Sequence, residues 1–279
     1  METRLPESSK LAFIGCGVMA ESIIAGLLRK QIVSPQQIVA SHPRADRRDE
    51  LADRFGIDCF EQNAAAVEAL PEAGIVVLGV KPQRIDRVLS DLREVVQESH
   101  LVISIIAGAR IEKIAAALAS ELVVRAMPNT PSQIGAGMTA WTCSQSVGES
   151  QRLQVRAMFS ALGNELFVET ENMIDMATSL SATGPTYIFM VMEAMTDAGV
   201  HLGFSRETAK ELVQQTMLGS VLFAIESHKH PAELRNMVTS PGGTSAEAIY
   251  QMEKGSLRTV LSKAIHAAYE RAVELGKRD

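Results

Sequence analysis

The feature that most constrains the fold is the repeated alternation of short apolar runs with helical stretches from residue 10 to residue 127. These runs are continuously apolar, which is typical of strands in a parallel sheet that is covered on both faces. Regular alternation of strand and helix predicts a doubly wound α/β domain. The predicted strands are residues 10–14, 38–41, 57–60, 75–80, 101–106 and 122–127, with 138–144 and 166–169 as further strands at the edge.

From residue 171 onward the apolar residues recur at helical spacing instead. The segment 186–202 is apolar around most of its circumference, so other helices must enclose it. A second copy of the chain would provide that cover more easily than one small domain, which favours an intertwined helical dimer. We therefore expect two domains, residues 1–169 and 170–279. The predicted helices of the second are 171–180, 186–202, 205–227 and 256–275, with Ser205 and Ser256 as N-caps.

A glycine loop stands between the first predicted strand and the first predicted helix, 18–30. Its sequence matches G-x-G-x-x-A, in which the first glycine makes a tight turn and the second lets a pyrophosphate approach the backbone. The small third residue allows the helix to pack closely on the strand. The loop therefore predicts a dinucleotide-binding site of the Rossmann type. Its residues are Gly15, Cys16, Gly17, Val18, Met19 and Ala20.

The end of the second strand distinguishes NADP from NAD. Proteins that bind NAD have a carboxylate at this position, which accepts a hydrogen bond from the ribose 2′-hydroxyl. This chain has Ser41 and Arg44 instead, with Arg47 and Arg48 one turn further on. Basic groups at this position suit a 2′-phosphate, although they also fit a solvated helix face. NADPH is the favoured cofactor, and NADH is the alternative.

Polar residues also follow two later strands. Lys81 lies in Val80-Lys81-Pro82-Gln83, and Asn129 lies between two prolines after the strand that ends at Met127. Taken singly, a lysine here is a surface residue and an asparagine a turn former. Ligands bind outside the carboxyl ends of strands in open α/β sheets. The shared position therefore favours a role at the cofactor.

A second glycine loop, residues 238–245, reads Val-Thr-Ser-Pro-Gly-Gly-Thr-Ser and leads into a further helix. The segment from Thr244 to Glu247 fits an S/T-x-x-E capping box, so Thr244 is the predicted helix cap. A helix N-terminus presents unpaired N–H groups and the positive end of the helix dipole. The loop predicts a site for a carboxylate or phosphate, with a tight structural turn as the alternative.

Composition excludes several classes of function. A net charge of −6 and a pI of about 5.6 attract neither nucleic acid nor an anionic membrane surface. The first ten residues are polar, unlike a signal peptide. Three cysteines, Cys16, Cys59 and Cys143, are widely spaced and fit neither a disulfide framework nor a zinc site. We expect reduced thiols and a cytoplasmic protein.

The sequence also lacks the motifs of other enzyme classes. It has no G-x-S-x-G elbow, no Walker loop and no HExxH motif. Hydride transfer needs no protein nucleophile, because the cofactor carries the reactive group. The pattern therefore favours an oxidoreductase, and no metal site is predicted.

Taken together, these motifs resemble pyrroline-5-carboxylate reductase. The resemblance implies NAD(P)H-dependent reduction of 1-pyrroline-5-carboxylate to L-proline, the last step of proline biosynthesis. It also implies a Rossmann domain followed by an all-α dimerisation domain, with dimers assembling into rings as large as a decamer. The matching segments run in order along nearly the whole chain: residues 13–20, 80–83, 127–131, 180–185 and 238–245.

The resemblance also implies roles for individual residues. Asn63 would contact the adenosine ribose or its phosphate beside Ser41 and Arg44. Ser245 would be the catalytic residue, whose hydroxyl meets the ring nitrogen of the substrate. The N–H groups of Thr244 and Ser245 would hold the substrate carboxylate. The remaining cofactor-binding residues would be Val80, Lys81, Pro82, Ala107, Asn129 and Glu171, and the remaining substrate-binding residues Ser240, Gly242 and Gly243.

The chain departs from the family pattern in two places. Ser245 stands where many members have threonine, which keeps the hydroxyl but loses a methyl that fixes its rotamer. Ala182-Thr183 stands where the family often has Gly-Ser, which affects loop geometry. The sequence leaves two alternatives: a β-hydroxyacid dehydrogenase, which would need a lysine on the helix 186–202, and a non-catalytic NADPH-binding protein.

Overall fold

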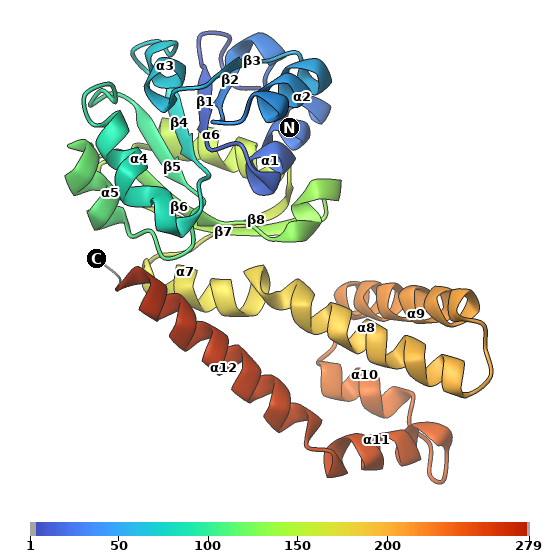
Figure 1. The fold of residues 1–279 in the computed structure, drawn as a ribbon. Coiled ribbons are helices and arrows are strands. Elements are labelled where there is room, and N and C mark those ends of the chain that lie inside the picture. Colours follow the sequence, from blue (N-terminus) through green and yellow to red (C-terminus); the bar gives the residue numbers. More distant parts are fainter. Residues whose placement is uncertain (1–3, 278–279) are drawn as a thin grey trace. The chain divides into compact units, whose positions relative to one another are not determined.

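The computed structural model describes residues 4–277, which fold as two compact units (Figure 1). The first unit comprises the chain up to Thr183 together with the segment from Ala268 onward. The second unit is Gly184–Ala267. The predicted domain boundary at residues 169/170 lies within the first unit, and as a functional division it stays a prediction.

The first unit is built on one eight-stranded sheet with the order β3-β2-β1-β4-β5-β6-β7-β8. Strands β1 to β6 pair in parallel, β7 is antiparallel to β6, and β8 is parallel to β7. The predicted Rossmann-type α/β fold is therefore confirmed. The strands are β1 Leu11–Ile14, β2 Ile38–Ser41, β3 Asp58–Phe60, β4 Ile75–Leu78, β5 Leu101–Ser104, β6 Val123–Met127, β7 Gly137–Cys143 and β8 Gly163–Phe167.

Helices cover both faces of this sheet, as the continuously apolar strands predict. Successive residues of β1 enter opposite cores: Leu11 and Phe13 pack under α1, α2 and α6, whereas Ala12 and Ile14 pack under α3, α4 and α5. The α-helices of the first unit are α1 Val18–Arg29, α2 Ala45–Phe55, α3 Asn63–Glu68, α4 Ile85–Leu92, α5 Ile111–Leu118, α6 Glu149–Ser160 and α7 Asn172–Ala177; the shorter turns are η1 Pro35–Gln37, η2 Pro82–Arg84, η3 Thr130–Ile134 and η4 Thr178–Ala182.

The last strand begins earlier than the predicted 166–169, because Gly163 opens it. Gly163 has φ 137°, and a side chain there would collide with the backbone of Gly137. Its missing Cβ lets β8 begin directly beside β7, where the two residues are paired. A sequence pattern does not reveal this close approach.

The second unit is helical. It contains α8 Gly184–His201, α9 Arg206–Ser227, α10 Pro231–Met237, α11 Thr244–Lys254 and the start of α12 Leu257–Gly276. Ser205 is confirmed as the cap of α9, because its hydroxyl accepts from Thr208 N–H at 3.1 Å. Ser256 directly precedes α12, and its carbonyl accepts from Val260 N–H at 3.0 Å, but its φ of 59° lies outside the extended conformation that is typical of an N-cap. No helix of the described residues 4–277 is long and apolar enough to cross a bilayer.

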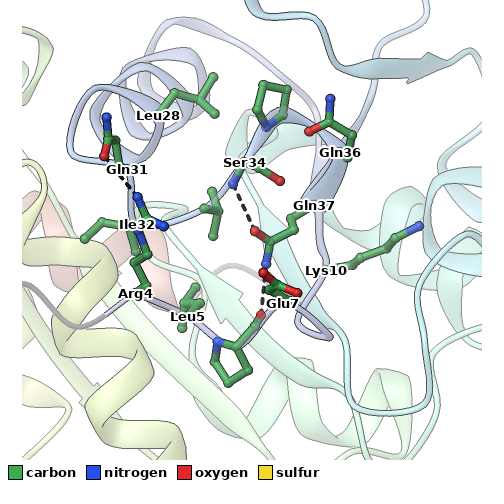
Figure 2. A pocket seen from close by; sticks show the side chains of 13 residues that line it. Arg4, Leu5, Glu7, Lys10, Leu28, Gln31, Ile32, Ser34, Gln36 and Gln37 are labelled. Carbon is green, nitrogen blue, oxygen red and sulfur yellow. Dashed lines mark hydrogen bonds between the residues drawn. The ribbon is translucent and has the colours of Figure 1, made fainter.

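A cavity of about 860 Å³ lies among the residues that precede β1 and β2 (Figure 2). Several of its polar groups are already engaged in hydrogen bonds within the chain. Arg4 donates to Gln31 at 3.0 Å, and the Gln37 amide donates to the carbonyls of Pro6 and Ser9. The cavity is at the amino ends of the strands, whereas ligands of open α/β sheets bind at the carboxyl ends.

Candidate functional site

A cavity of about 570 Å³ lies at the carboxyl ends of β1 and β4. The strand order reverses at this point, because β1 pairs with β2 on one side and with β4 on the other. Such a switch point is where dinucleotides bind in doubly wound sheets. The lining consists of the glycine loop, the segment after β2, part of α2 and the segment after β4: Gly15, Cys16, Gly17, Val18, Glu21, His42, Pro43, Arg44, Arg47, Glu50, Gly79, Val80, Lys81 and Arg84.

The glycine loop has the geometry that its sequence predicts. Gly15 adopts φ 80°, and a side chain there would collide with Cγ1 of Val80. A Cβ on Gly17 would meet no described atom within 4 Å, so the backbone is open to a ligand. Ala20 is buried beside Gly79, whose added Cβ would lie 3.3 Å from that of Ala20. Small residues thus allow α1 to start directly over β4. An accessible backbone of this kind is what a bound pyrophosphate requires.

A buried hydroxyl ends β2, and an exposed cation follows it. Ser41 is fully buried and donates to Oδ1 of Asn63 at 2.8 Å, which ties β2 to the start of α3. The Arg44 side chain is 66% exposed, and its Nε lies 3.3 Å from Asp46. Burial, and then the nearby Arg44 guanidinium, lower the pKa of His42, so this imidazole is neutral at pH 7.

The other two arginines of this cluster are already engaged. Arg47 is 12% exposed and pairs with Glu21 and Glu50. Arg48 donates to the carbonyls of His42 and Pro43 at 2.9 and 3.0 Å. The cluster is therefore neither a uniform phosphate site nor a uniformly solvated helix face. Arg44 is the member that is available to a ligand.

The predicted cofactor residues that do not line this cavity include Pro82, Ala107, Asn129 and Glu171, which lie at three other places in the first unit. Pro82 and Ala107 line a smaller cavity of about 210 Å³, together with Gly108 and Leu275. The side chain of Asn129 donates to Ser181 O at 3.3 Å and accepts from Met138 N–H at 2.9 Å. Asn129 therefore joins the end of β6 to β7 and to η4.

Glu171 belongs to a buried ion network rather than to the lining of the large cavity. Its carboxylate accepts from Ile111 N–H at 2.8 Å and from Arg125 at 3.0 Å. Arg125 and Asp175 are each 1% exposed and pair at 2.6 Å, with Arg110 at 3.5 Å from Asp175. This network joins β6 to α7. An arginine inside the apolar run Val-Val-Arg-Ala-Met was the signal that sequence reasoning missed.

The second glycine loop forms a tight turn followed by a helix. Gly243 N–H donates to Ser240 O at 3.0 Å, and Gly242 adopts φ 71° after Pro241, the pattern of a type II turn. The prediction that Thr244 caps the helix is wrong: Gly243 is the N-cap, and Thr244 is the first residue of α11. Two successive glycines let the turn lead straight into the helix.

Because α11 begins at Thr244, two backbone N–H groups of its first turn are unpaired in the described part of the chain. Within the described residues, the N–H groups of Thr244 and Ser245 have no acceptor, as expected in the first turn of a helix. Both side chains stand on the same first turn, with Ser245 partly buried and Ser240 exposed. The turn can therefore bind an anion and offer a hydroxyl beside it.

The cysteines are free thiols. Burial raises the pKa of Cys16 to about 12, so this residue of the glycine loop is protonated and unreactive at neutral pH. Burial also raises the pKa of Cys59 and of Cys143.

The N-terminal and the C-terminal parts of the chain each match a known protein family. Residues 171–275 match the family model described as pyrroline-5-carboxylate reductase dimerisation, and residues 10–108 match the model described as NADP oxidoreductase, coenzyme F420-dependent. A pyrroline-5-carboxylate reductase of Pseudomonas aeruginosa is 42% identical over 96% of this chain and 97% of its own length. The chain belongs to the pyrroline-5-carboxylate reductase family.

Solved structures of the family agree. The pyrroline-5-carboxylate reductase of Coxiella burnetii is 37% identical, with a TM-score of 0.87 over 97% of this chain and 100% of that one. The Plasmodium falciparum pyrroline carboxylate reductase, solved with NADP bound, is 30% identical. Its TM-score is 0.88 over 97% of this chain and 99% of that one. The family membership inferred from the motifs is confirmed.

Proposed function

We propose that this reductase-family chain reduces 1-pyrroline-5-carboxylate to L-proline with NADPH, in the last step of proline biosynthesis. The observation that carries the proposal is the relationship to proteins named pyrroline-5-carboxylate reductase over nearly the whole of both chains. Neither alternative has comparable support. The helix α8 contains no lysine, which a β-hydroxyacid dehydrogenase would need there.

The dinucleotide would bind in the first unit, along the cavity of the glycine loop. Gly15, Gly17, Val18, Met19 and Ala20 would form the turn and helix start for the pyrophosphate. The preference for NADPH over NADH rests on the absence of a carboxylate at the tip of β2 and on the exposed Arg44, supported by Ser41 and Asn63. The remaining cofactor-binding residues stay predictions of the sequence: Val80, Lys81, Pro82, Ala107, Asn129 and Glu171.

The substrate would bind at the turn that precedes α11. Its carboxylate suits the free N–H groups of Thr244 and Ser245, because the helix dipole adds positive potential there. Gly242 and Gly243 keep the backbone accessible, and Ser240 adds a hydroxyl at the other end of the turn.

The reaction mainly requires the protein to hold the substrate in position beside the cofactor. When bound, NADPH supplies a hydride to C5 of the protonated cyclic imine, whose C=N electron pair moves onto the nitrogen that already carries the proton. The Ser245 hydroxyl would orient that nitrogen, and the anion turn would fix the ring in place. Ser245 is thus the proposed catalytic residue.

The direct test is an absorbance assay of NADPH oxidation by the purified chain with 1-pyrroline-5-carboxylate. We expect substrate-dependent oxidation with L-proline as the product, and slower turnover with NADH. Binding of NADPH without proline formation would instead favour the non-catalytic alternative.

We also propose that the chain forms homodimers through its C-terminal helices. Large apolar side chains of α8 and α9 remain exposed in the single chain, including Phe189, Met190 and Phe223. Such a surface marks an interaction site, and the matched family model is one of dimerisation. Assembly of dimers into a decamer and a cytoplasmic location stay predictions of the sequence.

Sedimentation of the purified chain should show a dimer or a multiple of it. Met190→Glu should shift the distribution toward smaller species, because it places a charge on the apolar surface. Leu153→Glu on α6, also an exposed apolar residue, is the matched control and should leave it unchanged. A wild-type monomer at micromolar concentration would contradict the proposal.

A further inference from the structure

A carboxylate of the chain itself lines the glycine-loop cavity, where the phosphates of a dinucleotide are expected to bind. Glu21 lies in the first turn of α1 and lines the same cavity as Gly15 and Gly17. A negative charge there is favoured by the helix dipole, and it competes with a pyrophosphate for the same positive helix end. Left alone, Glu21 would weaken the binding of any dinucleotide phosphate.

Two arginines from α2 bind this carboxylate. Arg47 pairs with Oε2 of Glu21, and Arg54 pairs with Oε1, so each oxygen has its own guanidinium. Glu21 is 17% exposed and Arg47 is 12% exposed, which reduces screening of the pair by solvent. Arg47 also reaches Glu50 at 2.6 Å.

Arg47 contacts the glycine loop as well as the carboxylate. Its Nε lies 3.5 Å from the carbonyl oxygen of Cys16, at the centre of the loop. Burial disfavours the charge of Arg47, but hydrogen bonds to Glu21 and Glu50 outweigh it and raise the pKa of the guanidinium above its ordinary value. Arg47 therefore stays charged at every working pH.

We propose that Arg47, together with Arg54, is a positioning residue for the cofactor. It neutralises Glu21 and holds the glycine loop. The start of α1 thereby keeps its positive potential for the dinucleotide pyrophosphate. This role differs from that of Arg44, which we assign to the 2′-phosphate. It follows that Arg47 serves NADPH and NADH equally, whereas Arg44 distinguishes them. The inference rests on the proposed function, because it requires that the cavity binds NADP(H).

The test measures dissociation constants for NADPH and NADH, with kcat and KM, on the full-length chain at fixed ionic strength. Arg47→Met should raise both dissociation constants by about fivefold to tenfold. It should also raise the KM for the cofactor and leave kcat at saturating cofactor nearly unchanged. In the Arg47→Met background, Glu21→Gln should tighten both cofactors by a larger factor than it does in the wild-type chain, a non-additive result that a purely structural role of Arg47 does not give.

Two further variants complete the design. Arg44→Gln should weaken NADPH binding and leave NADH binding unchanged. Arg206→Met removes another arginine–carboxylate pair, with Asp197 in the second unit, and should change neither constant. Glu21→Gln alone preserves the helix and should tighten both cofactors about twofold to fivefold, so the proposal remains testable if Arg47→Met does not fold.

Three results would overturn the inference. They are equal affinities of Arg47→Met with and without Glu21→Gln, a loss confined to NADPH, or no tightening in Glu21→Gln. If the wild-type chain binds NADPH and forms proline, each of these results in the variants leaves the proposed function intact. A wild-type chain that binds neither cofactor would overturn both.

Discussion

Ser245→Ala is expected to lower kcat by roughly 100-fold or more while leaving the affinity for NADPH unchanged. Within the described residues the Ser245 hydroxyl has no hydrogen-bond partner, so its removal leaves no other group unsatisfied. The loss would therefore report on the substrate nitrogen rather than on folding. Steady-state kinetics with 1-pyrroline-5-carboxylate, together with a thermal unfolding curve, measures both quantities.

The matched control is Ser245→Thr, which keeps the hydroxyl and adds the methyl found in many family members. We expect this variant to retain activity within about threefold of wild type, because the helix position and the oxygen are preserved. An unchanged kcat/KM in Ser245→Ala would remove Ser245 from the mechanism. The anion turn could then still bind the substrate carboxylate through its backbone.

Arg125→Met is expected to lower the free energy of unfolding by about 3–5 kcal/mol. Arg125 and Asp175 are almost fully buried, so the variant leaves a carboxylate in the core with Arg110 at 3.5 Å as its remaining cationic partner. Methionine fills a similar volume, which keeps the packing loss small. Urea unfolding followed by circular dichroism measures the change.

The second variant of this cycle is Arg125→Met with Asp175→Asn. It removes the buried charge that the first variant leaves behind, so stability should recover in part. A loss below about 1 kcal/mol in Arg125→Met alone would mean that Arg110 and water satisfy Asp175 without Arg125. The ion network would then contribute little to the join between β6 and α7.

Much of the fold could be predicted from the sequence because it depends on local pattern. Most residues of the buried strands are apolar, and the glycine loop lies at the junction where Gly15 needs a positive φ. Ser205 caps α9 through a bond to a residue three positions away. Each of these features is decided within a few residues of the chain.

The remaining features depend on partners far away in the sequence. Arg44, Arg47 and Arg48 look alike as a cluster, and their different roles are set by Glu21, by backbone carbonyls and by solvent. Thr244 fits a capping box, but the turn from Ser240 to Gly243 starts the helix one residue earlier than that motif implies. Such competition between local motifs and tertiary contacts is not visible in one sequence.

The path of the chain through its two units limits how the helical unit can be exchanged between related proteins. The chain leaves the first unit after Thr183 and returns at Ala268, in the middle of α12. The helical unit is therefore an insertion with two junctions, and the second junction lies inside a continuous helix. A single added or deleted residue there would rotate every later side chain by about 100°. Leu275, which packs at Gly108, would then face elsewhere. A functional chimera must keep the helical phase across Ala268.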